Sequence, residues 1–161
     1  MDKQPYDPNI HHRRSMRLSS YDYSSTGVYY ATICVYERKP LLEKEELRTI
    51  VENMWKELPQ RFPGVSLDIF AIMPDHVHFI LWLEHQGENP PTFAQIVGAY
   101  KSLTARATLA YLRSKGYACT RHFWQRDYYE HVIRSEWELE QKRIYILNNP
   151  IKEQLKREGE L

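Results

Sequence analysis

Residues 65–83 read VSLDIFAIMPDHVHFILWL and decide the fold, because they predict two strands joined by a tight turn. Residues 65–72 and 76–83 are rich in β-branched and aromatic side chains, which favour strands. The Pro74-Asp75 pair between them is typical of a tight connection. The stretch therefore predicts an antiparallel hairpin.

Alternation along the second strand of this hairpin places two histidines on one face. His76 and His78 share that face with Ile80 and Trp82, while the other side chains of residues 76–83 form a wholly apolar face. We expect the apolar face to pack against helices and the histidine face to remain available at the start of the strand. Two imidazoles so placed lie roughly 6–7 Å apart along the strand, which suits joint ligation of one cation.

The segments on either side of the hairpin complete an alternation of strands and helices. In chain order we expect a strand over 28–36, a helix over 47–58, the hairpin, a helix from 93 to about 113, a strand over 128–133 and a helix that opens after Ser135. This order predicts an α+β domain, a ferredoxin-like split βαβ arrangement with an antiparallel sheet and an added C-terminal helix.

Polar residues mark the expected helix ends. Thr92 with Gln95, and Ser135 with Glu138, have the spacing of capping boxes. Pro150 is expected to end the last helix, because proline lacks the N–H that helix propagation requires.

Composition indicates one domain over residues 27–161, preceded by a basic arm over 1–26. The net charge is +1, so attraction to nucleic acid must come from local patches. No apolar run has the length of a membrane span and no signal peptide is evident, which predicts a cytoplasmic protein without membrane contacts. The only cysteines, Cys34 and Cys119, argue against a disulfide framework and exclude a four-cysteine zinc site.

The histidine pair alone leaves two interpretations open. His76 and His78 could hydrogen-bond within a polar end of the sheet, or they could hold a metal ion. A nucleotidyl hydrolase with alternating histidines would need a third at position 80, which is Ile80.

The last helix offers residues that would complete a metal-dependent site. Tyr145 and Asn149 are four residues apart and therefore share a helical face. An amide oxygen is a hard ligand, and with two neutral imidazoles it suits Mg²⁺ or Mn²⁺ bound to a phosphate. A deprotonated tyrosine is a nucleophile, so a phenol beside such a metal permits attack on phosphorus.

Each of these residues also has an ordinary structural interpretation. The chain has 12 tyrosines, so Tyr145 could be a core or surface residue, and Tyr128 and Tyr129 compete with it as nucleophiles. Asn148 and Asn149 could simply cap the helix before Pro150.

Four segments in this order resemble the REP-associated tyrosine transposases, relatives of the single-tyrosine HUH transposases of small bacterial insertion sequences. They are RRSMRLSSYDYSSTGVYYATICV (13–35), MPDHVHFILWL (73–83), FWQRDYYEHVIR (123–134) and YILNNPIK (145–152). The resemblance covers nearly the whole chain. It implies a ferredoxin-like HUH domain that recognises a DNA hairpin, such as a repetitive extragenic palindrome, and cuts single-stranded DNA beside it. The tyrosine would form a 5'-phosphotyrosine and free a 3'-hydroxyl, with a divalent ion required.

The resemblance assigns roles to individual residues. His76 and His78 correspond to the HUH histidines, Tyr145 to the nucleophile and Asn149 to the third metal ligand. Relatives from insertion sequences often have glutamine where this chain has Asn149. The implied partner is single-stranded or hairpin DNA in the nucleoid, bound by a monomer or homodimer with Mg²⁺ or Mn²⁺ and without a small-molecule cofactor.

Basic residues are candidates for phosphate contacts, and aromatic residues between them could stack on unpaired bases. The basic candidates are Arg13, Arg14, Arg17, Lys101, Arg106, Arg121, Arg126 and Arg134, and the aromatic ones are Tyr21, Tyr23, Phe123, Trp124, Tyr128 and Tyr129. The alternative is that many of the aromatics are core and many of the arginines form a solvated face.

Three functions are compatible with these patterns. The first is a metal-dependent, single-tyrosine DNA strand transferase. The second is a DNA protein that binds the hairpin without cutting it. The third is a metal-dependent phosphohydrolase of small nucleotides, in which water attacks, but this leaves the basic arm unexplained.

Overall fold

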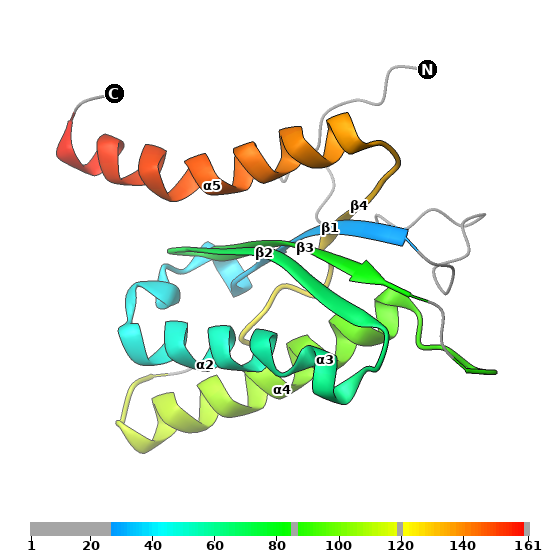
Figure 1. Cartoon of the computed structure of the whole chain (residues 1–161). Helices are drawn as coiled ribbons and strands as arrows, with labels where there is room; N and C mark the ends of the chain where they lie inside the picture. Colours follow the sequence, from blue (N-terminus) through cyan, green and yellow to red (C-terminus); the bar gives the residue numbers. More distant parts are fainter. Residues whose placement is uncertain (1–26, 85–86, 119–120, 160–161) are drawn as a thin grey trace.

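Four antiparallel strands form one sheet in the order β2-β3-β1-β4 in the computed structural model, which describes residues 27–84, 87–118 and 121–159 (Figure 1). The strands are β1 (Gly27–Cys34), β2 (Val65–Met73), β3 (His76–Leu83) and β4 (Tyr129–Ile133). The predicted hairpin is confirmed, because β2 pairs with β3 from Met73↔His76 to Val65↔Leu83. This strand order and the helices between the strands confirm the ferredoxin-like α+β fold.

Helices cover both faces of the sheet (Figure 1). The main helices are α2 (Glu45–Lys56), α4 (Phe93–Ser114) and α5 (Glu136–Glu158), with a short α3 (Leu58–Arg61) and two 3-10 turns, η1 (Tyr36–Arg38) and η2 (Leu41–Glu43). Helices α2 and α4 lie on one face and α5 crosses the other. The domain therefore has three layers, with the sheet in the middle.

The two faces of β3 bury different cores. The apolar face packs on α2 and α4 as expected, with Val77, Phe79 and Leu81 in one large buried cluster. The histidine face is covered by α5, where Ile80 packs with Ile146 in a smaller cluster. The expectation that this face remains available holds only in part, because α5 lies over it.

The predicted helix starts are largely confirmed. Thr92 and Gln95 form both hydrogen bonds of a capping box at the start of α4. At α5, the Ser135 side chain accepts from the Glu138 N–H. The Glu138 carboxylate instead accepts from the Arg134 N–H, so this box is half formed.

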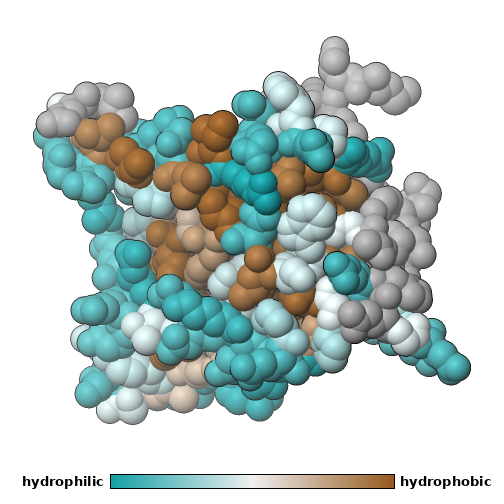
Figure 2. All heavy atoms as spheres, in the orientation of Figure 1, coloured by the Kyte–Doolittle hydropathy of each residue, from teal (hydrophilic) through white to brown (hydrophobic). Residues whose placement is uncertain are grey.

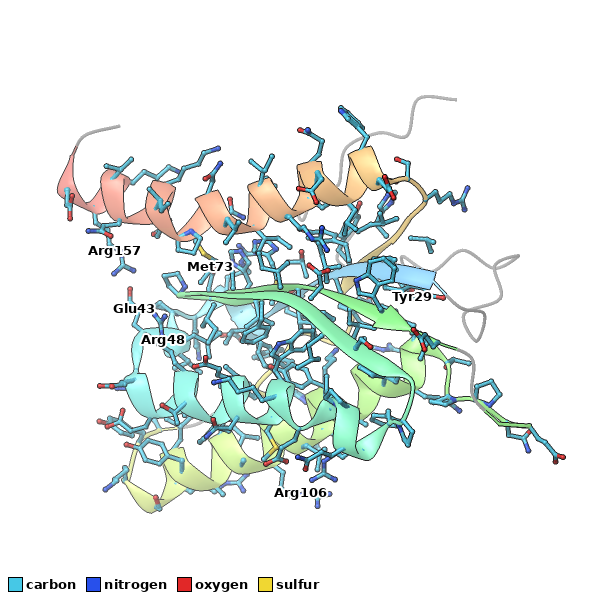
Figure 3. All side chains as sticks on the ribbon, viewed as in Figure 1. Tyr29, Glu43, Arg48, Met73, Arg106 and Arg157 are labelled. Carbon is cyan, nitrogen blue, oxygen red and sulfur yellow. The ribbon has the colours of Figure 1, made fainter. Side chains whose placement is uncertain are left out.

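The prediction that Pro150 ends the last helix is wrong, because α5 continues to Glu158. Proline removes one backbone hydrogen bond, and the helix continues here despite that loss. Arg157 forms an ion pair with Glu43 across 2.6 Å, which ties the end of α5 to η2 (Figure 3). The helix ends at Gly159, whose φ of 76° is the left-handed conformation that glycine adopts at helix ends.

A β-bulge in β2 holds α5 on the sheet. Leu67 pairs with Leu81 and Ile69 with Ile80, so Asp68 is the extra residue. Its carboxylate accepts from Arg143 Nε at 2.9 Å and Nη2 at 2.5 Å, and from Trp82 Nε1 at 2.9 Å. The bulge thus turns a carboxylate towards α5 and fixes the helix over the histidine face.

Replacing Arg143 with Met should destabilise the domain by about 2 kcal/mol, because Asp68 is left nearly buried without its cation. The Arg143 guanidinium holds the pKa of Asp68 below its ordinary value. The pair therefore contributes its full stabilising free energy at pH values above the pKa of aspartate in the unfolded chain, about 4. This contribution is lost as pH falls further, through the lower pKa of Asp68 in the folded protein. Urea unfolding of Arg143→Met and of the unaltered chain, at about pH 7 and about pH 3, measures the stability difference.

The stability difference between Arg143→Met and the unaltered chain should shrink at the lower pH. Arg106→Met, at an exposed position on α4, is the matched control and should change little at either pH. An equal deficit at both pH values would show that the loss comes from packing and not from the ion pair.

Candidate active site

The two histidines of β3 face one another beneath α5. Their Nε2 atoms are 2.9 Å apart, and the ring planes meet at 85° with centroids 4.5 Å apart. Two nitrogen lone pairs repel at this distance, so a proton or a cation must lie between them. The alternation predicted from sequence thus brings both side chains to one point.

A chain of polar contacts fixes the ring of His76. Its Nδ1 lies 2.6 Å from Asp75 Oδ1, and Arg38 Nε donates to Asp75 Oδ2 at 2.9 Å. Arg38 and Glu37 both adopt left-handed φ angles of 55° and 56°, which cost energy in non-glycine residues. This strained turn directs Arg38 back towards the site, where its Nη1 also donates to Cys34 Sγ.

The ring of His78 is held from β1 and from α5. Its Nδ1 lies 2.9 Å from Thr32 Oγ1 and 3.1 Å from the Tyr30 hydroxyl. The Asn149 amide nitrogen lies 3.1 Å from Nε2, so α5 holds the other side of the ring. Burial lowers the pKa of His78 to about 3, which keeps the imidazole neutral and able to ligate a metal near neutral pH.

Tyr145 lies on α5 beside His78 and remains open to solvent. The two ring centroids are 5.8 Å apart with planes at 72°, and 47% of the tyrosine is exposed. The neighbouring Tyr30 is only 3% exposed, and burial raises the pKa of its hydroxyl. Of these two phenols beside His78, Tyr145 is the one that a DNA strand could reach.

The donor set fits a single divalent ion. Both Nε2 atoms converge, and Asn149 can present its Oδ1 to the same point by a half-turn of its amide. Hydrogen bonds to Nδ1 from the outer side orient ligating imidazoles in metalloproteins, and both rings have such partners here. Within the described residues, no group of three His, Cys, Asp or Glu side chains could hold a metal, so an ion here would depend on the amide.

The basic residues predicted to contact DNA are spread over several surfaces. Arg121, Arg126 and Arg134 are exposed. Arg106 is exposed on the outer side of α4, in the layer away from α5 (Figure 3). The arm with Arg13, Arg14 and Arg17 lies outside the described residues. Contact of any of these residues with DNA stays a prediction.

Lys101 already has acceptors within the fold. Its Nζ donates to the carbonyls of Gln125 and Arg126, each at 2.7 Å, and burial lowers its pKa to about 8. It therefore fixes the segment before β4 whether or not it also meets a phosphate.

Two of the aromatics predicted to stack on bases belong to the core. Phe123 and Trp124 are 1% and 5% exposed, and Trp124 Nε1 donates to Thr104. The prediction that Phe123 and Trp124 stack on bases is therefore wrong, because both side chains are buried. Tyr128 and Tyr129 are half-buried, and Tyr21 and Tyr23 lie outside the described residues.

The sequence interpretation missed the residues that orient the histidines. Thr32 pairs directly with His78 in the sheet, so it follows from the register of β1 against β3. Asp75 was interpreted only as part of the turn. Arg38 gave no sequence signal, because its position depends on the left-handed turn.

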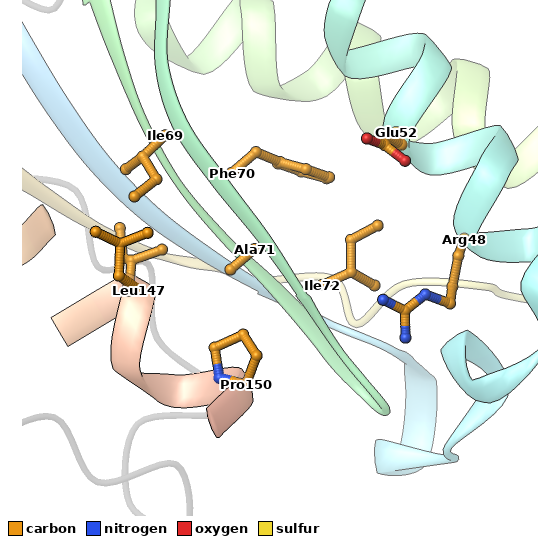
Figure 4. A pocket seen from close by; sticks show the side chains of 9 residues that line it. Arg48, Glu52, Ile69, Phe70, Ala71, Ile72, Leu147 and Pro150 are labelled. Carbon is orange, nitrogen blue, oxygen red and sulfur yellow. The ribbon is translucent and has the colours of Figure 1, made fainter. Parts of the chain in front are cut away.

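A hollow lies between α5, the edge strand β2 and α2 (Figure 4). Its lining includes Phe70, Ile72, Leu147 and Pro150, with Arg48 at the rim. Figure 2 shows hydrophobic side chains along α5 and around this hollow, where Leu147 is 60% exposed. None of the four residues predicted for catalysis lines it.

A ferredoxin-like sheet whose histidine pair lies beneath a tyrosine-bearing helix defines a domain of the HUH class, as the sequence resemblance implies. The profile of the family described as "Transposase IS200 like" matches residues 24–149, most of the chain. The chain therefore belongs to the IS200-like transposase family.

Individual relatives agree with this assignment. An uncharacterised protein of Haemophilus influenzae is 34% identical, covering 91% of this chain and 92% of the relative. A second H. influenzae protein, provisionally named a REP-associated tyrosine transposase, is 26% identical over 84% of this chain and 77% of its own length. The predicted resemblance to REP-associated tyrosine transposases is confirmed.

Solved structures share the fold. A REP-associated tyrosine transposase bound to a REP hairpin superposes with a TM-score of 0.63 at 19% identity, covering 86% of this chain and 74% of that one. A Deinococcus radiodurans protein provisionally named a transposase gives a TM-score of 0.52 at 21% identity, covering 82% of this chain and 95% of that one.

None of the described helices combines the length and the apolar character that a bilayer span needs.

Proposed function

We propose that this transposase cuts single-stranded DNA beside a hairpin and joins the cut 5' end to Tyr145. One observation carries the proposal: the half-exposed phenol of Tyr145 lies on α5 next to the point where His76, His78 and Asn149 converge. The site thus combines a nucleophile that DNA can reach with a neutral ligand set for a divalent ion.

The reaction requires few groups. The Tyr145 oxygen loses its proton and forms a bond to phosphorus, while the bond from phosphorus to the 3'-oxygen breaks and that oxygen takes up a proton. A divalent ion, Mg²⁺ or Mn²⁺, would supply positive charge to the phosphate oxygens. The phosphotyrosine conserves the bond energy, so a different 3'-hydroxyl can reverse the step and complete strand transfer.

The protein contributes positioning. Packing of α5 on the sheet, through Ile146 and the Arg143–Asp68 pair, fixes Tyr145 relative to the histidines. The Asp75 and Thr32 contacts fix the rings so that the two Nε2 atoms face one another, with that of His78 beside Asn149 on α5. We infer that the substrates are palindromic hairpins of chromosomal DNA, in line with the hairpin-bound relative of the same fold.

Labelled hairpin DNA with a single-stranded flank tests the proposal. Incubation with protein and Mg²⁺ should give an adduct that survives denaturant and carries the label only when it is 3' of the cut. Cleavage without an adduct would mean that water attacks, which favours the phosphohydrolase. Binding without cleavage would favour the non-catalytic hairpin-binding protein.

Asp75→Ala should weaken Mn²⁺ binding by about 10- to 100-fold, because the ring of His76 loses the carboxylate that orients it. Titration calorimetry with Mn²⁺ measures the change, and circular dichroism should show an intact fold. Glu84→Ala, an exposed acidic residue just after β3, is the matched control. If both variants bind Mn²⁺ as the unaltered protein does, the contact between Asp75 and His76 does not support a metal site.

A further inference from the structure

Lys142 lies on the same side of α5 as Tyr145, one helical turn before it. Its Nζ is 4.7 Å from the centroid of the Tyr30 ring and 6.0 Å from that of Tyr145. Tyr30 in turn contacts His78 Nδ1. The ammonium therefore borders the space between the predicted nucleophile and the histidine pair.

Among the described residues, no carboxylate forms an ion pair with this ammonium, and Glu138 attracts it only from a longer distance. Glu138, four residues earlier on α5, is engaged by His131 and by the Arg134 N–H. Asp75, on the far side of the histidines, is engaged by Arg38 and His76. Lys142 is also half-buried, and burial lowers its pKa.

A half-buried ammonium that forms no close ion pair is costly, and an anion that comes into contact with it lowers that cost. The ammonium lies over the rings of Tyr30 and Tyr145, which carry no negative charge while their hydroxyls are protonated. The scissile phosphate carries one negative charge and must lie within bonding reach of Tyr145. A phosphate attacked by Tyr145 would therefore come close to the Lys142 ammonium, which lies 6.0 Å from the centroid of the Tyr145 ring.

We propose that the Lys142 ammonium binds a non-bridging oxygen of the scissile phosphate and stabilises the charge that develops there as Tyr145 attacks. This inference rests on the proposed function and adds a catalytic residue to it. Lys142 keeps its proton throughout: the bond formed is from Tyr145 oxygen to phosphorus, and the bond broken is from phosphorus to the 3'-oxygen. A fixed donor aimed at developing charge typically contributes about 10²- to 10³-fold in rate.

The test compares charged and neutral phosphates. Lys142→Met keeps the length of the side chain and removes the charge, and Lys142→Arg keeps the charge. Each variant is mixed with saturating hairpin DNA that has either a normal phosphodiester at the cut site or a methylphosphonate, in which a neutral methyl replaces one non-bridging oxygen. Both diastereomers are measured separately, and the rate of adduct formation in a single turnover is recorded.

On the normal phosphodiester, Lys142→Met should be about 100-fold slower than the unaltered protein and Lys142→Arg should recover much of that loss. On one methylphosphonate diastereomer, the difference between Lys142→Met and the unaltered protein should shrink to within about threefold, because the oxygen that Lys142 binds is gone. Hairpin affinity should be unchanged. Lys56→Met, on α2 in the opposite layer, is the control and should match the unaltered protein throughout.

Any other result contradicts either the role of Lys142 or the proposed function, and the results distinguish the two. If Lys142→Met slows both phosphodiester and methylphosphonate equally, Lys142 acts only on the structure of α5 and the inference fails while the proposed function stands. If Lys142→Met is as fast as the unaltered protein, the inference also fails alone. If the unaltered protein forms no adduct with any substrate, the proposed function fails and the inference with it.

Discussion

Tyr145→Phe should abolish the denaturant-resistant adduct with hairpin DNA, with a loss of at least about 10⁴-fold in the rate of cleavage. Phenylalanine keeps the ring that packs edge-on against His78, so the position of α5 should not change. Only the oxygen that bonds to phosphorus is removed. Single-turnover cleavage on a denaturing gel measures the effect.

The matched control is Tyr129→Phe, which removes a hydroxyl from a half-buried tyrosine on β4 whose ring lies 5.8 Å from that of Tyr30. It should cleave within about threefold of the unaltered rate, since the Tyr129 hydroxyl has no part in the proposed reaction. Hairpin affinity should be the same for both variants, because binding rests on contacts spread over a larger surface. An adduct from Tyr145→Phe as abundant as that from the unaltered protein would show that another residue is the nucleophile.

His76→Ala should abolish cleavage and reduce Mn²⁺ affinity by at least about 100-fold, while hairpin affinity is largely spared. Its side chain lies at the start of β3 and is 17% exposed, so part of the space left by its removal is open to solvent. His78 is a poorer choice, because it is 4% exposed and its loss would leave a cavity. Calorimetry with Mn²⁺ and gel-shift titration with the hairpin give the two affinities.

The control for this prediction is His122→Ala, an exposed histidine outside the site. It should retain metal affinity and cleavage. If His76→Ala loses hairpin binding together with cleavage, the histidine has a structural role and the metal assignment is wrong.

The geometry of single strands and helices was enough to predict the secondary structure elements. It also predicted which site residues share one face of the same strand or helix. Alternation along β3 puts His76 and His78 on one side, and a four-residue spacing on a helix puts Tyr145 and Asn149 on one side. These relations depend only on the geometry of a strand or a helix. The turn and capping residues set most element boundaries in the same way.

The contacts that assemble the site were beyond local rules, because they join residues far apart in the sequence. The bulge at Asp68 and its pair with Arg143, 75 residues later, place α5 over the histidines. The helix passes Pro150, and the ion pair between Arg157 and Glu43 joins its last turns to η2. The register of β1 against β3, which brings Thr32 to His78, also needed the folded sheet.

The central claim is that the oxygen of Tyr145 attacks the DNA phosphate, and mapping the covalent adduct tests it most directly. The protein is incubated with the hairpin substrate and Mg²⁺, digested with protease and nuclease, and analysed by tandem mass spectrometry. We predict a single peptide that carries a 5'-linked nucleotide on Tyr145. A nucleotide on Tyr30, Tyr128 or Tyr129, or cleaved DNA without any modified peptide, would contradict the account.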